Sequence, residues 1–424
     1  MRTGRPKQPL ILSTMRIPTP AFLIIEGCDF INCPVGGQLS TAKQLMRVFG
    51  PAAGLVGWAT DASTPVGRWI ARDFAGQRHA FFAFDREQPA ASKPVIPRRL
   101  KAYFKLRRYR DAILSIGGCP VFLQAIECLL PVASWGFSSI CYCFPGVANS
   151  LRCSRYPFAR PFAPFLDIAM FSALKRVDVI LAAADSDAIR GLVDRSGGLL
   201  SPGCVIQTPT RVDTDLFTPR PKNDVREHLG FPLGVPLFVS SGRIGRLKGW
   251  PLLLDAFQRV LNRLPEAKLC FIGDGEDGTM LRNNIIALGL ERSVSVTGFL
   301  PADQVAAWLN AADVVVSGSL LEGWPVALLE ALASGKPLVT TLVSGVREMV
   351  AEGKNGFIVR DRDPGAFAAA MLSARDLVEA ESISLQIASR YAAKNWDRDL
   401  MAVWPALRRA VGSRHASPPQ LQFR

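Results

Sequence analysis

The feature of this sequence that most constrains its fold is a repeated alternation between short apolar segments and helical patterns. In the second half, apolar runs predict strands at 237–241, 268–272, 294–298, 313–316, 337–341 and 356–359. In the first half, they predict strands at 21–25, 54–59, 79–84, 112–116, 139–144 and 177–182. Helices are predicted after Gly37 as far as Val48 and at 67–74, 121–130, 165–174 and 185–194. Because strands that alternate with helices pair in parallel, the predicted fold class is α/β.

The length of 424 residues exceeds what one hydrophobic core usually organises, so two domains are predicted. A turn-rich stretch at 205–219 is interpreted as the crossing between them. We therefore expect a first domain at 1–208 and a second at 209–395. A helix at 396–412 is expected to pack back on the first domain, and 413–424 is expected to be a flexible tail.

Charge and cysteine content narrow the class of protein. The formal net charge of +14 favours anionic partners, namely nucleotide phosphates, phospholipid headgroups or nucleic acid. The nine cysteines have no repeated spacing, which is typical of reduced thiols in a cytoplasmic protein. Cys141 and Cys143 have no second pair or nearby histidine to complete a metal site, so no metal is expected. The uncharged run that ends at Leu151 is broken by Pro131, Gly136 and other turn residues, and predicts buried strand and loop rather than a membrane span.

The stretch 317–337 predicts a strand end, a tight turn and a helix. Pro325 fits the first helical position, and Gly335 with Pro337 ends the helix. Glu322 lies in the turn and Glu330 lies inside the helix. The first N–H groups of a helix have no internal partner and suit a phosphate. Two carboxylates beside such an anion site suggest recognition of hydroxyls, and the combination indicates a nucleotide sugar.

A basic, glycine-rich loop follows the strand predicted at 237–241. Arg243 and Lys248 lie where the carboxyl end of a strand meets the start of a helix, which is where ligands bind in open parallel sheets. Two cations at this place predict a clamp for a diphosphate. Gly273 and Gly275 form a weaker G-x-G signal after the next strand. In the first half, Gly36 and Gly37 would let the backbone approach a ligand closely, and a plain turn is an equal interpretation.

The segment 93–110 has eight basic residues and no acidic one, with tyrosine and phenylalanine among them. A short amphipathic helix of this kind suits an anionic membrane surface. A solvated basic face that covers the sheet is the alternative, and nothing resembling a nucleic-acid-binding module supports a third. The residues predicted to contact the membrane are Arg98, Arg99, Lys101, Lys105, Arg107 and Arg108.

The motifs of the second half together resemble a known family. These motifs stand in the family's order: Gly242-Arg243 with Lys248-Gly249, Gly273-Asp-Gly275, Glu322-Gly-Trp-Pro with Glu330, and Gly353-x-Asn-Gly356. They resemble the retaining glycosyltransferases of the GT-B fold, in the large family 4 (glycosyl transferases group 1). The resemblance covers about residues 241–359. The first half matches more loosely, through Gly36 and Gly37 and the crossing at 209–213.

This resemblance implies two Rossmann-like domains that face each other across a cleft. It also implies roles by position. Arg243 and Lys248 would bind the donor diphosphate, Glu330 the ribose hydroxyls, and Glu322 the donor sugar, while Gly36 and Gly37 would close over the phosphate from the acceptor side. The catalytic residues would be Glu322, Arg243 and Lys248. The donor-binding residues would be Gly242, Arg243, Lys248, Gly273, Gly275, Glu322, Gly323, Trp324, Val326 and Glu330. No cofactor and no metal are implied, because the two cations stand in for a metal.

The sequence departs from the family pattern at two places. Arg211 stands in the crossing where the family more often has glycine. Many members place a histidine of the first domain against the donor sugar, but none of His79, His228 and His415 matches that position, so no catalytic histidine is assigned.

The resulting hypothesis is a retaining hexosyltransferase that uses a nucleoside diphosphate sugar. Its expected acceptor is a lipid-linked saccharide or a growing surface polysaccharide such as lipopolysaccharide. The expected location is cytoplasmic and peripheral at the inner face of the membrane, because the basic segment 93–110 suits anionic lipid. The alternatives are a non-catalytic homologue that binds nucleotide sugars and an epimerase of the GT-B fold. Nucleic acid is not an expected partner.

Overall fold

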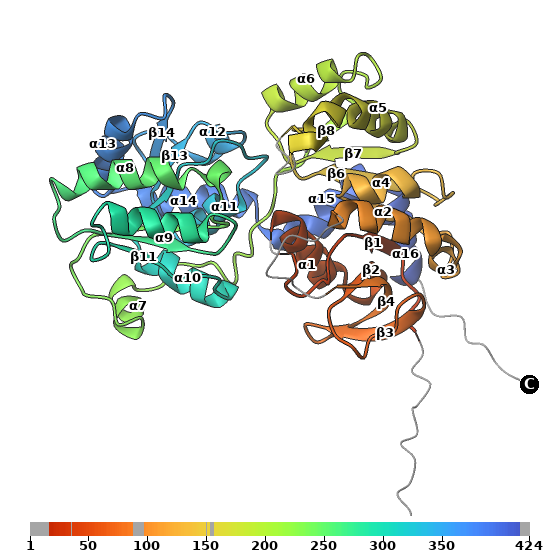
Figure 1. Cartoon of the computed structure of the whole chain (residues 1–424). Coiled ribbons are helices and arrows are strands. Elements are labelled where there is room, and N and C mark those ends of the chain that lie inside the picture. Colours follow the sequence, from red (N-terminus) through yellow and green to blue (C-terminus); the bar gives the residue numbers. More distant parts are fainter. Residues whose placement is uncertain (1–16, 35, 88–96, 150, 153–156, 416–424) are drawn as a thin grey trace, which may run out of the picture.

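The chain forms two sheets, one in each half (Figure 1). The computed structural model describes residues 17–34, 36–87, 97–149, 151–152 and 157–415. The first sheet has eight strands in the order β3-β4-β2-β1-β5-β6-β7-β8. Its strands are β1 (Phe22–Ile25), β2 (Ala53–Ala59), β3 (Trp69–Phe74), β4 (Gln77–Arg86), β5 (Val121–Leu123), β6 (Ile140–Phe144), β7 (Val179–Ala182) and β8 (Val205–Gln207).

The second sheet has six parallel strands in the order β11-β10-β9-β12-β13-β14. They are β9 (Leu237–Ser241), β10 (Lys268–Ile272), β11 (Val294–Val296), β12 (Val314–Ser317), β13 (Leu338–Thr341) and β14 (Gly356–Val359). The helices of this half are α7 (Lys222–His228), α8 (Trp250–Leu261), α9 (Gly278–Ala287), α10 (Ala302–Ala311), α11 (Val326–Ala333), α12 (Val346–Met349) and α13 (Pro364–Ala374), with a single-turn 3-10 helix η3 (Arg246–Lys248). Each predicted strand of this half is present, with ends that shift by two residues at most.

Helices cover both faces of the first sheet. They are α1 (Gly37–Phe49), α2 (Arg98–Arg108), α3 (Arg110–Leu114), α4 (Ile126–Val132), α5 (Ala163–Leu174) and α6 (Ser186–Arg195), with 3-10 helices η1 (Gly50–Ala52) and η2 (Pro157–Phe162). One core joins the sheet to α2, α4, α5 and α6, and the other joins it to α1 and the C-terminal helices. Because both faces are covered, the central strand β1 is apolar at every position, and all four of its residues are buried.

Three predictions in the first half were wrong. The predicted helix at 67–74 is β3, which pairs antiparallel with β4 through a two-residue turn at Ala75 and Gly76, both with positive φ. The predicted strand at 112–116 lies in and just after α3, and the predicted helix at 121–130 is β5 followed by α4. Short apolar runs do not by themselves separate a buried strand from a buried helix, which explains the last two errors.

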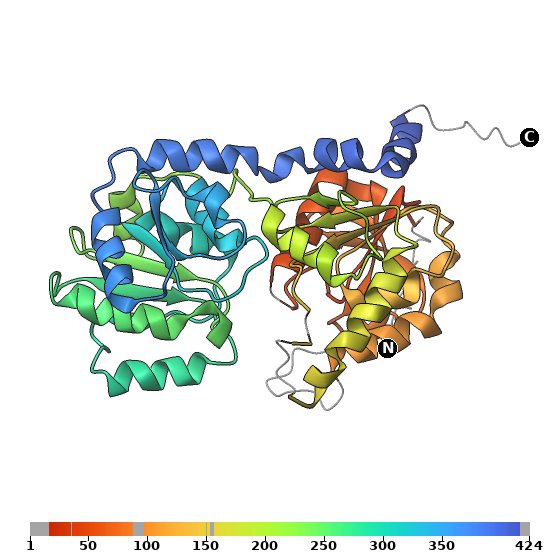
Figure 2. The same cartoon turned by 90° about the horizontal axis from the view of Figure 1, so that it is seen from above.

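The C-terminal segment spans both halves of the molecule (Figure 2). It consists of α14 (Ala380–Arg390), the turn η4 (Ala393–Asn395), α15 (Trp396–Val403) and α16 (Pro405–His415). The single predicted helix at 396–412 is two helices, because Pro405 cannot continue α15. Trp404 at the break is buried in the first-sheet core and donates from Nε1 to Oγ of Ser139 at 2.9 Å. Of the predicted tail, 413–415 belong to α16, and 416–424 lie outside the described residues.

Candidate functional site

The loops at the carboxyl edge of the second sheet interlock through closely spaced glycines. A β-carbon on Gly249 would lie 1.7 Å from the carbonyl oxygen of Gly318, and one on Gly273 would lie 1.9 Å from the carbonyl oxygen of Gly242. Both Gly249 and Gly273 also have positive φ. The backbone contacts alone require glycine at both positions, so the glycines are not by themselves evidence of a ligand site. They bring the loops after β9, β10 and β12 into one surface, which carries the predicted donor-binding residues.

Lys248 and Glu322 form the centre of this surface. Lys248 Nζ lies 2.6 Å from Oε1 of Glu322, and Ser319 Oγ donates to the same oxygen at 2.7 Å. The Glu322 side chain is largely buried, whereas Lys248 is partly exposed. The carbonyl of Ser319 accepts from Thr341 Oγ1 and from Arg362 Nη1, which fixes the turn before α11. The two predicted site residues are therefore in direct contact and held by neighbours that the sequence analysis did not identify.

Arg243 lies on the neighbouring loop with a carboxylate partner of its own. Its Nε is 2.7 Å from Oε2 of Glu276, which follows Gly275. Both side chains are about half exposed, so the pair contributes little stability. A pair of this kind exchanges partners at low cost. Arg243 is thus available to an anion that arrives at the loop, and Glu276 is the residue that such an anion would replace.

Glu330 lies in α11, one turn beyond its start. Burial raises the pKa of its carboxyl group to about 8. Its side chain makes no hydrogen bond to any described residue. The helix begins at Val326 after Pro325, with no acid in its first turn and no side chain that caps its N–H groups. The first turn of α11 therefore offers unpaired donors near a partly buried carboxyl group without a partner among the described residues, which can accept from hydroxyls when ionised.

Residues of the first half meet this surface directly. A β-carbon on Gly37, at the start of α1, would lie 3.9 Å from Cγ2 of Val326. A β-carbon on Gly323 would lie 2.4 Å from the carbonyl oxygen of Pro145 and 2.8 Å from Cα of Gly146. The starts of α1 and α11 thus face each other, and the turn around Gly323 packs against the loop that follows β6.

Asp185 adds a polar link between the two halves. Its backbone N–H donates to Ser344 Oγ at 2.9 Å, and its carboxylate accepts from the N–H groups of Ala188 and Gly345. The same side chain therefore caps α6 and holds the loop before α12. Beside it, Arg347 forms an exposed ion pair with Asp187 at 3.6 Å. The sequence analysis did not identify these contacts, because they join residues about 160 positions apart.

Trp324 supports the turn from behind. Its ring is buried between Tyr391 and Gly345, and its carbonyl accepts from Thr210 Oγ1 at 3.2 Å. Its indole N–H has no partner among the described residues. The Trp324 side chain is therefore core, and only its backbone neighbours the predicted sugar position.

Most of the basic residues predicted to contact a membrane bind carboxylates of the first half. Lys101 and Lys105 pair with Asp85 at 2.8 and 3.3 Å. Arg98 pairs with Glu87 at 3.3 Å, and Arg99 with Glu127 at 3.7 Å. Arg107 donates instead to the hydroxyl of Tyr103, and Arg108 lies over the ring of Tyr109. These acids lie at the end of β4 and the start of α4, so four of the six basic residues of α2 are paired with carboxylates of the first half.

The histidines lie away from the donor loops where they are described. His79 is buried in β4 with Nδ1 2.9 Å from the carbonyl oxygen of Ala53, and His228 ends α7. The Cys141 and Cys143 thiols are buried in β6, and burial raises the pKa of both. Among the described residues, no group of three or more histidine, cysteine, aspartate or glutamate side chains could hold a metal ion. Within the same residues, no helix combines the length and apolar character needed to cross a membrane.

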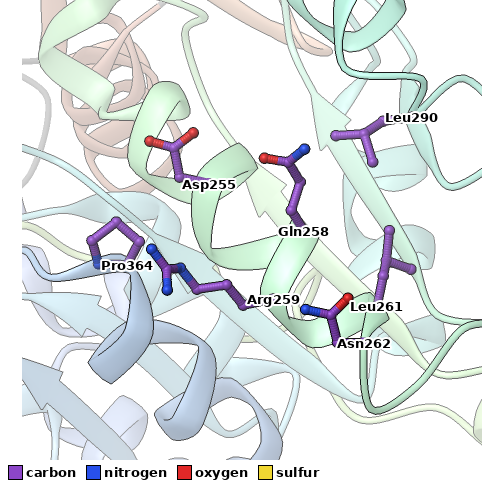
Figure 3. Close-up of a pocket in the computed structure, with 7 residues that line it drawn as sticks. All are labelled: Asp255, Gln258, Arg259, Leu261, Asn262, Leu290 and Pro364. Carbon is purple, nitrogen blue, oxygen red and sulfur yellow. The ribbon is translucent and has the colours of Figure 1, made fainter.

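A separate cavity of about 560 Å³ lies on the outer side of α8 (Figure 3). It is lined by Asp255, Gln258, Arg259, Leu261, Asn262, Leu290 and Pro364. It shares no residue with the donor loops. We therefore assign the candidate site to the loops and not to this cavity.

Comparison with known proteins places these loops in a family. Residues 221–387 match the family described as "Glycosyl transferases group 1". This part of the chain therefore resembles a glycosyl transferases group 1 domain. It contains Arg243, Lys248, Glu322 and Glu330, so the resemblance inferred from their motifs is confirmed at the level of the family.

Curated proteins that match this part of the chain share about a third of the aligned residues. The D-inositol 3-phosphate glycosyltransferase of Corynebacterium urealyticum is 32% identical over 209 residues, which are 46% of this chain and 49% of the relative. The putative colanic acid biosynthesis glycosyltransferase WcaL of Salmonella typhimurium is 35% identical over 143 residues, which are 32% of this chain and 35% of the relative. The aligned part thus spans about half, or less, of these relatives.

Solved structures resemble the whole chain. Sucrose-phosphate synthase from Thermosynechococcus elongatus has a TM-score of 0.69 at 19% identity, and the match covers 95% of this chain and 99% of that one. HepE from Anabaena, in complex with UDP and glucose, has a TM-score of 0.66 at 17% identity, with 90% and 99% covered. The chain has the GT-B fold, as predicted, and both halves take part in it.

Proposed function

We propose that this protein is a glycosyltransferase that moves a hexose from a nucleoside diphosphate sugar to an acceptor hydroxyl. The observation that carries the proposal is the grouping of Lys248, Glu322 and Glu330 at the start of α11, inside a glycosyl transferases group 1 domain. Lys248 and Arg243 would bind the diphosphate, Glu330 the ribose, and Glu322 the sugar. Solved neighbours bind UDP and UDP-glucose, which supports a nucleotide sugar as the donor.

The proposed reaction uses the groups that the loops supply. The bond between the anomeric carbon and the diphosphate oxygen breaks, and a bond forms between that carbon and the acceptor oxygen. The acceptor's proton passes to an oxygen of the leaving phosphate, so the products are a glycoside and a nucleoside diphosphate. Lys248 and Arg243 stabilise the negative charge on the leaving group, in place of a metal or cofactor. Configuration at the anomeric carbon is retained in this proposal.

The proposed acceptor is a lipid-linked saccharide or a surface polysaccharide, reached from the cytoplasmic face of a membrane. Two similar proteins support this class: WcaL, named for colanic acid biosynthesis, and the lipopolysaccharide outer core galactosyltransferase WaaB, whose structure has a TM-score of 0.57 to this chain. The net charge of +14 favours contact with anionic lipid.

A panel of nucleotide sugars tests the donor. The purified chain is incubated with UDP- and GDP-sugars, with and without a bacterial lipid extract, and released nucleotide and sugar products are measured. We expect acceptor-dependent release with one donor class. Lys248→Ala should lower kcat roughly a hundredfold, because one preorganised charge is lost. The exposed Arg263→Ala serves as the control and should leave it unchanged.

Other outcomes would contradict the proposal. Binding of a nucleotide sugar without release by any acceptor would indicate a non-catalytic binder. A changed sugar still attached to its nucleotide, found by mass spectrometry, would indicate an epimerase. Equal activity of the wild type and Lys248→Ala would show that Lys248 does not stabilise the leaving diphosphate.

A further inference from the structure

The outer face of η2 and α5 exposes large apolar side chains. Phe158, Phe162, Phe165 and Ile168 are between 58% and 70% exposed. We call these four residues the α5 patch. Its sequence signal is a run of three phenylalanines among prolines.

The helix that carries the patch has almost no polar surface. The sole charged residue of α5 is Asp167, which is buried and pairs with Arg195 at 3.4 Å. The exposed positions Phe165, Ile168 and Ala169 are apolar, whereas Ser172 near the end of the helix is exposed and polar. A helix with apolar side chains on both its inner and its outer face is normally covered by other structure on both. A contiguous exposed patch of this size marks a contact surface.

The same layer of helices adds further apolar side chains. Leu100 and Phe104 of α2 are 49% and 60% exposed. Helix α4 lies between α2 and α5, and all three pack on one face of the first sheet (Figure 1). Both α2 and α5 follow strands whose carboxyl ends face the second half, so their first turns lie near the junction of the two halves. Two contacts place these turns: Arg98 pairs with Glu87 after β4, and Asn149 Nδ2 donates to the carbonyl of Ala163.

In the sequence, cations flank the segment that carries the α5 patch, and the patch itself has no acid. Lys175 and Arg176 follow the last turn of α5, and Arg152 precedes η2; all three are exposed and form no ion pair with a described residue. Apolar rings bordered by cations complement an anionic lipid surface, in which rings enter the interface and cations bind headgroups. A second copy of this chain would instead bring like charges together, because the net charge is +14.

We propose that the α5 patch docks the protein on an anionic lipid bilayer. The contact differs from the one predicted by sequence, since most of the α2 cations are bound to carboxylates of the first half. Docking through this face would place the bilayer beside the junction of the two halves, where a lipid-linked acceptor could reach the site. This last step rests on the proposed function, whereas the docking itself does not. Binding to lipid requires neither nucleotide nor catalysis, so the two proposals can fail separately.

Vesicle flotation of the full chain tests the proposal. Vesicles of phosphatidylcholine alone are compared with vesicles that also contain phosphatidylglycerol. We expect the wild type to float with the mixed vesicles and much less with the neutral ones. The double variant Phe162→Asp with Phe165→Asp should lower partitioning at least about tenfold, because two rings that would enter the bilayer are replaced by charges that the anionic surface repels. Lys175→Glu with Arg176→Glu should weaken binding mainly at low salt.

The matched control lies on the other half of the molecule. Met280 and Ile286 of α9 are 51% and 60% exposed, so Met280→Asp with Ile286→Asp makes the same chemical change away from the patch. This control should bind vesicles as the wild type does. Thermal unfolding checks that each variant is folded, and a variant that fails it is replaced by Phe162→Ser with Phe165→Ser.

Three results would overturn the proposal. The first is no flotation of the wild type with anionic vesicles. The second is equal loss of binding in the control variant. The third is a wild-type dimer, seen by light scattering after gel filtration, that the α5-patch variant dissociates while its vesicle binding is unchanged; the patch would then be an interface between copies. Release of nucleotide from a donor in the absence of lipid should be the same in the wild type and the patch variant.

Discussion

At the scale of single residues, the two carboxylates around the start of α11 have different surroundings. Glu322 accepts a hydrogen bond from Lys248 and another from Ser319. Glu330 has no hydrogen-bond partner among the described residues, and burial raises its pKa to about 8. Glu322 is therefore already paired with a cation, whereas Glu330 is free to accept hydrogen bonds from a ligand. This difference gives Glu330 a test by pH.

We predict that nucleoside diphosphate binds more tightly as the pH rises from 7 to 9. With a pKa of about 8, Glu330 is about nine-tenths protonated at pH 7, and only the ionised form accepts from both ribose hydroxyls. The apparent Kd should fall roughly tenfold and then level off, because the competent fraction limits affinity. Calorimetry of UDP and GDP binding measures this. Glu330→Gln should show weak binding with a flat profile, and a flat profile in the wild type would exclude the ribose role.

Glu26 predicts a pH effect on stability. It follows β1, is buried, and accepts from the N–H of Gly27 with one oxygen, while Oε2 has no partner. Burial, and then the charge of Glu127, raise its pKa to about 8 from an ordinary value of 4.5. The folded state thus holds the proton more tightly than the unfolded state. This contribution is fully present below about pH 4.5 and is lost as the pH rises to about 8.

Glu26→Gln should remove that loss. The free energy of unfolding of the wild type should fall between pH 5 and 8 by up to ~1.4 kcal/mol per unit more than that of the variant. Urea denaturation at pH 5, 6.5 and 8 measures the difference. Parallel pH profiles for the two proteins would show that Glu26 does not titrate in this range.

At the scale of elements, the second half was predictable because its strands are buried on both faces. The residues of β9, β10 and β14 were predicted without error, since each is a short run bounded by a glycine, which follows β9 and β10 and begins β14. In the first half, β3 was mistaken for a helix because it lies at the sheet edge, where its alternation is weak and a hairpin turn decides its structure.

The residues of the donor loops were predictable from local sequence motifs, but the distant residues that contact them were not. Arg243, Lys248, Glu322 and Glu330 lie in motifs whose order along the chain is characteristic. Other contacts join distant positions and have no local signal. These are the pairing of Arg243 with Glu276, the support of Ser319 by Arg362, and the packing of Gly323 on Pro145.

We predict that Gly323→Ala disrupts the junction between the β6 loop and the turn before α11. The added β-carbon would lie 2.4 Å from the carbonyl oxygen of Pro145, so the halves must separate. Transfer should fall by at least about a hundredfold, because displacement near 1 Å misaligns the reacting groups. UDP or GDP binding should change less, since the donor loops belong to the second half.

Steady-state kinetics and calorimetry separate these two effects. Gly191→Ala is the control, because a β-carbon at this position of α6 meets no atom within 4 Å. It should behave as the wild type does. Normal transfer by Gly323→Ala would show that the junction seen here is not the arrangement in which transfer occurs.

At the scale of the whole molecule, the two halves are joined by two chain segments that pair with each other. Val212 of the first segment forms a parallel bridge with Ala392 of the second, through hydrogen bonds of 2.9 Å from Val212 N to Tyr391 O and 2.7 Å from Ala393 N to Val212 O. The Arg211 side chain links the first of these segments to α15. Its guanidinium binds Asp399 at 2.9 Å and lies over the ring of Trp396.

We predict that Arg211→Gly loosens this connection. The variant loses a nearly buried guanidinium that also donates to the carbonyl of Arg390 at 3.1 Å, and it leaves Asp399 without its main partner. The free energy of unfolding should fall by roughly 2 kcal/mol. The distribution of distances between dyes on the two halves, measured by single-molecule energy transfer, should broaden.

Arg398→Ala is the matched control for Arg211→Gly. Arg398 also pairs with Asp399, at 3.0 Å, but its side chain is 72% exposed. An exposed pair contributes less than about 1 kcal/mol, so this variant should keep nearly full stability and the wild-type distance distribution. Equal effects of the two substitutions would mean that Arg211 acts only as one more surface charge. A broadened distance distribution without a loss of stability would instead assign Arg211 to the relative position of the two halves, on which the proposed transfer from donor to acceptor depends.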